Sequence, residues 1–98
     1  MKWEIELSQA IADQKKIEIE YNGAVREVAP HILGCSATGQ LTVSTFQFHH
    51  STNPMKNNQW RTFIVDNIES LKILDDTFFP RCDYNPYDKN FQKVVSQI

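Results

Sequence analysis

The sequence predicts a β-rich α+β domain in which a strongly bent sheet of about five strands is flanked by an N-terminal and a C-terminal helix. Three observations indicate this class. Apolar and polar residues alternate in several short runs, as they do in half-buried strands. The dipeptide Asn22-Gly23 separates two of these runs and is a strong hairpin signal. The segments at both ends of the chain instead place apolar residues at helical spacing.

Composition narrows the class of protein. A chain of 98 residues is long enough for one domain with one modest core. Its net charge of −2 argues against a nonspecific nucleic-acid binder that relies on a broad cationic surface. Cys35 and Cys82 are too few and too irregularly placed for a disulfide scaffold or a zinc ribbon, so we expect free thiols. No signal peptide or membrane-spanning run is evident, and we therefore expect a cytoplasmic protein without a membrane partner.

The first element is open to two interpretations. Trp3, Ile5 and Leu7 alternate as in a strand, whereas Trp3, Leu7, Ala10 and Ile11 follow one face of a helix. We favour the helix, because alanine has a high helix propensity and the basic residues at the carboxyl end suit the helix dipole.

A hairpin over residues 17–33 follows. With a two-residue turn at Asn22-Gly23, Ile19 faces Arg26, so that Arg26 projects from the apolar face of the hairpin. The glutamates of the two strands share the opposite face: Glu18, Glu20 and Glu27. A bulged turn would shift this register by one residue. Pro30 cannot donate a ladder hydrogen bond, so it marks an edge, a bulge or the strand exit.

Three more strands are predicted after a loop that Gly34 and Gly39 bracket. The third strand covers Leu41–Phe48, the fourth Trp60–Asp66 and the fifth Ile68–Leu74. In the third strand the apolar residues lie first on one face and, from Phe46, on the other. This pattern predicts a bend or bulge at which the buried face changes, as suits a small barrel.

The remaining segments are a loop and a tail. Residues 49–59 are polar and rich in turn formers, which predicts a long exposed loop. Phe78, Phe79 and Pro80 are expected to close the core. Asp88 is a suitable N-cap for a final amphipathic helix over Asp88–Ile98, whose apolar positions are Phe91, Val94, Val95 and Ile98. We expect this helix to bury Phe91, Val94 and Val95.

Two patterns within residues 7–79 resemble the WYL domain family. The first is Tyr-x-Gly-x-x-Arg-x-Val-x-Pro-His-x-Leu-Gly over residues 21–34, and the second is Arg-x-Phe-x-x-Asp-x-Ile over residues 61–68. The Trp-Tyr-Leu tripeptide that names the family is replaced by Leu41-Thr42-Val43, and we expect no DNA-binding domain within the 98 residues. The resemblance implies a small Sm-like or SH3-like barrel. It also implies a sensor that binds a nucleic acid or a nucleotide-type ligand and controls an attached DNA-binding domain.

Arg26 and Arg61 are the strongest candidates for a binding site. A planar and always charged guanidinium suits a carboxylate or a phosphate. Each arginine stands among core-type residues, and each coincides with a position of the WYL resemblance. Because no acidic residue of the matching strands is expected on the same face, we expect an external anion between them. The alternative is a surface ion pair with Glu18, Glu20 or Glu27.

Four further residues are candidates for ligand contacts: His31, Gln47, Ser51 and Trp60. Trp60 would stack on a base, with core packing as the competing explanation. For His31 the alternative is a structural role in which the side chain is hydrogen-bonded within the protein. For Gln47 and Ser51, near the end of the third strand, the alternative is that water solvates the side chains. His49 and His50 are adjacent and point to opposite faces of a strand, so we expect no metal site.

The sequence favours a binding protein over an enzyme. It contains no nucleophile elbow, glycine-rich phosphate loop or suitably spaced acid pair, so we expect neither catalysis nor a cofactor. The leading hypothesis is a ligand-binding or sensor domain for a nucleotide, an oligonucleotide or another anion, with the 47–60 loop as cover. The second is a protein-interaction or homo-oligomerisation module that uses the apolar faces of the two terminal helices and exposed aromatics: Phe46, Phe48, Tyr84 and Tyr87. The third is a protein that acts against a nucleotide signal by sequestering it.

Overall fold

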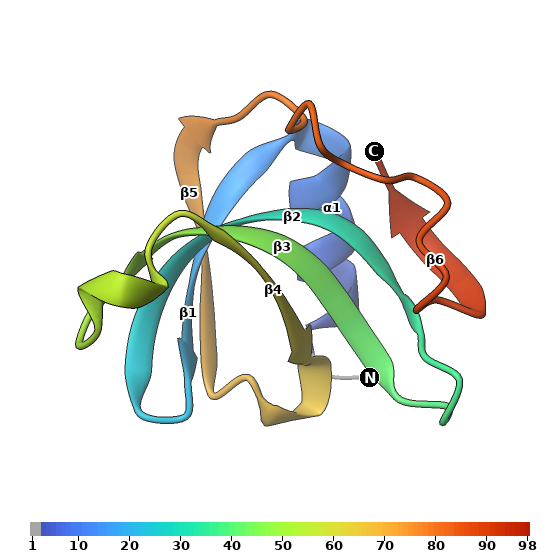
Figure 1. The fold of residues 1–98 in the computed structure, drawn as a ribbon, viewed down its shortest axis with the longest axis horizontal. Helices are drawn as coiled ribbons and strands as arrows, with labels where there is room; N and C mark the ends of the chain where they lie inside the picture. Colours follow the sequence, from blue (N-terminus) through green and yellow to red (C-terminus); the bar gives the residue numbers. More distant parts are fainter. Residues whose placement is uncertain (1–2) are drawn as a thin grey trace.

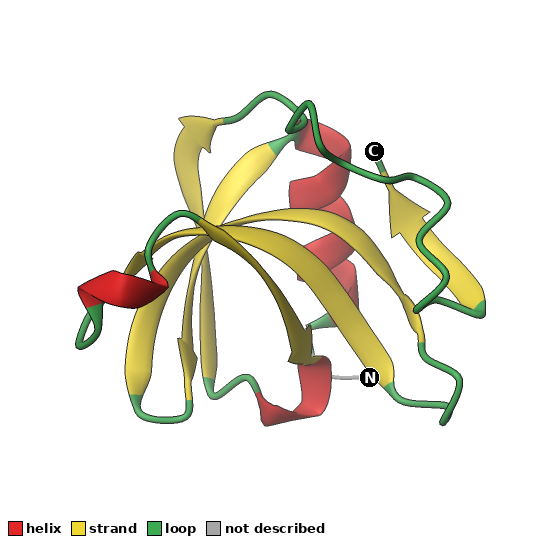
Figure 2. Cartoon of the chain, viewed as in Figure 1, coloured by secondary structure: helices red, strands yellow, loops and turns green. Residues whose placement is uncertain are grey.

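The computed structural model describes residues 3–98, which contain one α-helix, six β-strands and two short 3₁₀ turns (Figure 1). The helix is α1 (Glu4–Asp13). The strands are β1 (Lys15–Tyr21), β2 (Ala24–Cys35), β3 (Leu41–His50), β4 (Gln59–Ile64), β5 (Ser70–Thr77) and β6 (Lys93–Gln97). The two 3₁₀ turns are η1 (Pro54–Lys56) and η2 (Val65–Asn67), drawn red like α1 in Figure 2.

The strands form one antiparallel sheet with the order β4-β3-β2-β1-β5, and β6 pairs with β2 outside this path. The sheet curls strongly, and η2 connects its two edge strands, β4 and β5 (Figure 1). The predicted class, a small β-rich α+β domain with an N-terminal helix, is therefore confirmed. The sheet has six strands, one more than predicted.

The β1–β2 hairpin has the predicted two-residue turn. Asn22 and Gly23 both have positive φ angles, 51° and 76°, which this kind of turn requires. Ile19 pairs with Arg26, so the predicted register is confirmed and Arg26 shares a face with the apolar residues of β1. The turn chemistry and the apolar alternation therefore specify the same pairing, although they are independent signals.

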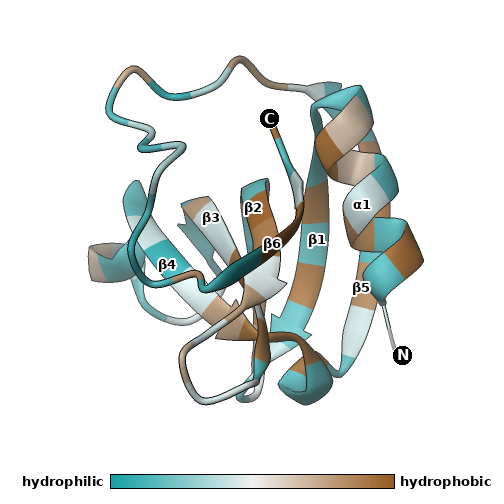
Figure 3. Cartoon of the chain, turned by 90° about the vertical axis from the view of Figure 1, so that its right-hand side faces the viewer, coloured by the Kyte–Doolittle hydropathy of each residue, from teal (hydrophilic) through white to brown (hydrophobic). Residues whose placement is uncertain are grey.

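The main core fills the concave face of the sheet, which we call the inner face. Leu7, Ala10 and Ile11 of α1 are buried there, which confirms the helical interpretation of this segment. They pack with inward residues of every strand from β1 to β4 and with the η2 region: Ile17, Ile19, Tyr21, Val28, Leu33, Leu41, Val43, Phe63, Val65 and Ile68. Figure 3 shows α1 lying beside β1 and β5. Burying each of these aliphatic side chains contributes about 1.5–3 kcal/mol to folding before entropy is subtracted.

The convex face of the sheet, the outer face, is also covered. Phe46 of β3 is only 4% exposed and packs there with Ala29 and Phe78. The prediction that the buried face of the third strand changes at a bend is therefore wrong, because β3 is buried on both faces. Two bulges do interrupt the β2–β3 ladder: the register leaves His31 of β2 and Phe48 of β3 unpaired.

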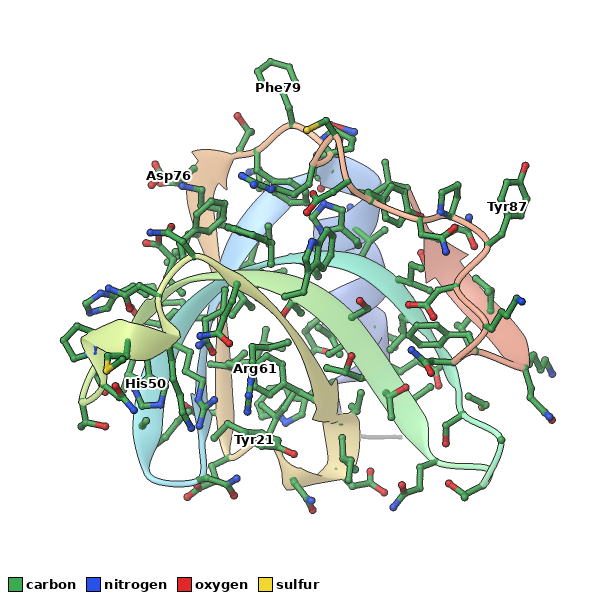
Figure 4. The ribbon with its side chains drawn as sticks, viewed as in Figure 1. Tyr21, His50, Arg61, Asp76, Phe79 and Tyr87 are labelled. Carbon is green, nitrogen blue, oxygen red and sulfur yellow. The ribbon has the colours of Figure 1, made fainter. Side chains whose placement is uncertain are left out.

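Residues 78–98, the C-terminal arm, provide this cover without forming a helix. The arm crosses the outer face as an extended chain that ends in β6 (Figure 3). The predicted helix over Asp88–Ile98 is therefore wrong. Phe91 is buried as expected, but Val94 and Val95 are 43% and 42% exposed. The expected closure by Phe78 is confirmed, whereas Phe79 is 90% exposed and projects from the start of the arm, at the top of Figure 4.

The sheet explains why the arm ends in a strand. β1 pairs with β2 only as far as Val28, so the backbone of β2 beyond that point has a free edge. β6 occupies this edge and pairs with residues from Ile32 to Cys35. A buried strand edge without partners would leave polar groups unsatisfied, and β-branched valines suit a strand. Long-range pairing therefore overrides the helical spacing of the apolar residues.

Candidate anion site on the inner face

Arg26 lies on the inner face among apolar side chains and is only 3% exposed. Its guanidinium donates one hydrogen bond to the carbonyl of Tyr21 at 3.1 Å and another to Oε1 of Gln47 at 3.4 Å. The rings of Tyr21 and Phe63 each lie 5.4 Å from its guanidinium carbon, within cation–π range. Its Nε atom is buried and has no hydrogen-bond partner within residues 3–98.

Arg61 of β4 joins Arg26 on this face. In β4 it alternates with Trp60 and Thr62 and shares a face with the fully buried Phe63. Its Nε atom is also buried without a partner in the described part of the chain. Figure 4 shows the Arg61 and Tyr21 side chains beneath the arch that β3 and β4 form. The structure therefore brings together the two arginines that the sequence singled out.

No carboxylate balances these two cations. Across residues 3–98 the ion pairs are Lys16 with Glu27 and Arg81 with Asp83, and neither involves Arg26 or Arg61. The alternative of a surface ion pair with Glu18, Glu20 or Glu27 is therefore not what the structure shows. The pKa of Arg26 lies below the ordinary arginine value, because burial disfavours its charged form and the nearby charge of Arg61 adds to this effect.

His50 adds a hydrogen-bond donor to the inner face. It pairs with Arg26 across the β2–β3 ladder and is 6% exposed. Burial lowers its pKa first, and the positive charges of Arg26, Lys56, Arg61 and His49 lower it further. Its Nδ1 accepts hydrogen bonds from the backbone N–H groups of residues 52 and 53, at 3.3 and 3.1 Å. The neutral imidazole therefore carries its proton on Nε2 and can donate it to an anion.

The sequence analysis places His49 and His50 on opposite faces without assigning either one to the inner face. Simple alternation from Leu41 through Gln47 would place His49 on the inner face. The bulge at Phe48 inserts one residue and reverses this choice, so that His50 points inward and His49 is exposed. A bulge of this kind leaves no local signal in the composition of the strand.

Gln47 and Ser51 support the site and the loop beside it. Gln47 is fully buried, accepts from Arg26 and donates from Nε2 to the carbonyl of Lys56 at 2.8 Å. It thus connects the arginine to the η1 segment of the loop predicted as a cover. Ser51 is exposed, and its Oγ accepts from the backbone N–H of Val25 at 3.0 Å. Both side chains therefore have structural partners of their own.

Trp60 and His31 lie on the outer face, away from the two arginines. Trp60 pairs with Phe46 and donates from Nε1 to Oδ2 of Asp83 at 2.9 Å. His31 is fully buried. Its Nδ1 donates to the carbonyl of Ala29 at 2.8 Å, and its Nε2 accepts from the backbone N–H of Arg81 at 3.3 Å. Burial is the main cause that lowers its pKa, so this histidine is a neutral structural residue.

Other kinds of site have little support in the described residues. Cys35 and Cys82 are free thiols, as predicted. Residues 3–98 contain no group of three or more histidine, cysteine, aspartate or glutamate side chains placed to hold a metal ion. Within the same range, no helix has the length and apolar character needed to cross a membrane.

Comparisons with family models, with curated proteins and with solved structures found no match for this chain.

Proposed function

We propose that this protein is a non-catalytic binding domain for a phosphate-bearing anion of the nucleotide or oligonucleotide class, held on the inner face by Arg26 and Arg61. The observation that carries the proposal is the pair of guanidiniums without a carboxylate partner, each with a buried and unpartnered Nε atom. Such a pair is unfavourable by itself, because each cation is desolvated near a like charge. A bound anion would remove this penalty.

The neighbouring groups support an anionic ligand over a neutral one. His50 offers an N–H donor next to Arg26, and Lys56 adds a positive charge from the η1 segment. Gln47 holds Arg26 from the side, which orders the guanidinium before a ligand arrives. Preorganised donors of this kind lose little entropy on binding. The strand order, with η2 between the two edge strands, also fits the Sm-like barrel that the WYL resemblance implies.

The test measures the affinity of the full chain for ATP and for a short single-stranded oligonucleotide by titration calorimetry. Arg61→Ala should weaken binding by about 10- to 100-fold, because a charge-assisted hydrogen bond contributes about 1.5–3 kcal/mol. Arg61 is the better position to vary, since Arg26 is buried and its removal also disturbs the core.

Arg81→Ala is the matched control, since Arg81 is also an arginine but lies over the Phe46 ring on the outer face. It should bind both probes as the unmodified protein does. Equal affinities for Arg61→Ala and the unmodified protein, or no binding of either probe, would contradict the proposal.

The C-terminal arm supports a second candidate function, a protein-interaction module. Phe79 and Tyr87 are 90% and 87% exposed and project from the arm into solvent (Figure 4). Exposed aromatics of this kind are enriched in interfaces. The predicted contribution of Phe46 to such a surface is wrong, because that ring is buried beneath the arm. Sedimentation of the full chain beside Phe79→Ser would show whether these rings mediate self-association.

A sequestering role is a variant of the anion-binding proposal. A domain that binds a nucleotide signal tightly can act by lowering the free concentration of that signal. This role predicts tight binding and slow release, which the same titrations report together with the dissociation rate.

A further inference from the structure

A pocket of about 260 Å³ opens on the outer face, between the C-terminal arm and strands β2 to β4. Its lining includes Ile32, Ser44 and Trp60 from the sheet, and Tyr84 and Asp88 from the arm. The pocket lies on the opposite face of the sheet from Arg26 and Arg61, since its sheet residues alternate with the inward ones. What it binds is thus a separate question from the function of the inner face.

Ser44 is the unusual residue in this pocket. Its side chain is only 8% exposed, and its hydroxyl makes no hydrogen bond with any of residues 3–98, although the hydroxyls of Thr42 and Thr45 on either side each have a partner. Among residues 3–98 the fully buried side-chain atoms without a partner are the Nε atoms of Arg26 and Arg61, so solvent reaches the Ser44 hydroxyl through the pocket. The hydroxyl is therefore free to form a hydrogen bond with a polar ligand that enters the pocket.

The charge around the pocket is negative. Asp83 accepts a hydrogen bond from Trp60 Nε1 through Oδ2, and its Oδ1 lies 3.6 Å from the Nε atom of Arg81. The arginine therefore balances the negative charge of Asp83. Asp88 accepts from the backbone N–H of Asn90 at 2.9 Å through Oδ1 only, and it forms no ion pair within the described chain. No lysine or arginine lines the pocket. One half-buried carboxylate therefore remains without a cation.

The aromatic walls favour a particular class of cation. Trp60 and Tyr84 both line the pocket, and their rings are held in place by contacts with the buried His31 ring, at centroid distances of 4.8 and 5.1 Å. Ordered tryptophan and tyrosine faces attract cations that carry polarizable or apolar groups. A metal ion would instead demand several oxygen ligands, which the described residues do not group together.

We propose that the outer-face pocket binds a small organic cation, a primary ammonium or guanidinium group on an alkyl stem. Its N–H groups donate to the Ser44 hydroxyl and to the free oxygen of Asp88, while its stem packs on Ile32 and the aromatic walls. The same chemistry is available from a free amine and from a lysine or arginine side chain of another protein.

The test is a titration of the ¹⁵N-labelled full chain with n-butylguanidinium, n-butylammonium and uncharged n-butanol, followed by the indole N–H resonance of Trp60. That resonance is assigned with Trp60→Phe. The cations should shift it and saturate, with dissociation constants of about a millimolar for so few atoms, whereas butanol should bind at least about tenfold more weakly. A tripeptide with a central arginine, beside one with a central glutamine, shows whether a protein side chain can be the source.

Two variants locate the cation. Asp88→Asn and Ser44→Ala should each weaken butylguanidinium by about tenfold, while Asp75→Asn, on β5 at the far edge of the sheet, should bind as the unmodified protein does. Equal affinity for butanol and butylammonium, unchanged affinity in both pocket variants, or no shift of the Trp60 resonance with any cation would overturn the proposal. None of these outcomes depends on whether the inner face binds an anion.

Discussion

His31 is one of the residues that join the sheet to the C-terminal arm. It occupies a bulge of β2, and its ring contacts Phe78 and Tyr84 of the arm at centroid distances of 5.1 Å each. Both ring nitrogens are engaged, one with the carbonyl of Ala29 and the other with the N–H of Arg81. A second proton, on Nε2, would point at the Arg81 N–H and would break this hydrogen bond. It would also place a positive charge in a buried site, so the folded state favours the neutral ring.

This neutral ring predicts that the protein loses stability in mild acid. The pKa of His31 in the folded state lies below the value of 6.5 that it has in an unfolded chain. The unfolded chain then binds the proton more strongly, so stability is complete above about pH 6.5 and falls as the pH drops toward the lowered value. Chemical denaturation at several pH values between about 7.5 and 5 measures this slope.

His31→Phe is the informative variant, because phenylalanine keeps a ring in the aromatic cluster and removes the titration. It should be less stable at neutral pH, since two buried polar groups lose their partner, but its stability should fall less steeply with acid. It should keep some slope, because the pKa of His50 is lowered too. Parallel curves for the variant and the unmodified protein would show that His31 does not drive the acid response.

At the scale of elements, the arm depends on Gly34. A Cβ at this position would meet the backbone of β6, at the carbonyl of Lys93 and the Cα of Val94, as well as the ring of Phe91. The backbone of Gly34 has no positive φ angle, so the need for glycine here is close packing and not strain. The pairing of β6 with β2 is therefore possible because one position lacks a side chain.

Gly34→Ala should detach β6 from β2 and lower the free energy of unfolding by about 1–3 kcal/mol, as overpacking does in a core. Hydrogen exchange locates the effect. The amides of Gln92 and Ile98, which donate to the carbonyls of Cys35 and His31, should lose protection. The amides of the β1–β2 hairpin should keep theirs. Unchanged protection at Gln92 and Ile98 would mean that β6 accommodates the methyl group.

At the scale of the whole molecule, the two faces of the sheet carry opposite charge. The inner face gathers the positive charges of Arg26, Arg61 and Lys56 beside the neutral His50, whereas the pocket of the outer face is lined by Asp83 and Asp88. The net charge of −2 hides this separation. Local fields, more than the total charge, decide which ligands approach each face.

Inorganic tripolyphosphate should therefore raise the melting temperature of the full chain, because a ligand that binds only the folded state stabilises it by mass action. At a concentration about 100 times its dissociation constant, the gain is about 2.7 kcal/mol. The gain should shrink between about 50 and 300 mM salt, since salt screens the attraction of the phosphates to the half-buried Arg61 and Lys56. It should be smaller in Arg61→Ala and unchanged in Arg81→Ala; an equal gain in all three proteins would place the anion elsewhere.

Local sequence signals were enough for the hairpin that carries Arg26. The alternation of β1 and the positive φ preference of Asn22-Gly23 both act over a few residues, so they determine turn, register and face together. The α1 helix was predictable for the same reason, since its buried stripe is a property of ten consecutive residues. The same alternation in β4 places Arg61 on the face of Phe63. The expected curl of the sheet then brings this face toward the one that carries Arg26.

Only the tertiary structure decided the rest of the site and the course of the arm. The bulge at Phe48 selects His50 over His49, and it arises from the pairing of β3 with β2. The spacing of Phe91, Val94 and Val95 suits a helix as well as a strand, and the free edge of β2 selects the strand. Covering the outer face then buries Ser44 and Phe46 and packs Trp60 against this second cluster. These outcomes depend on segments that are distant in the chain, so no local pattern specifies them.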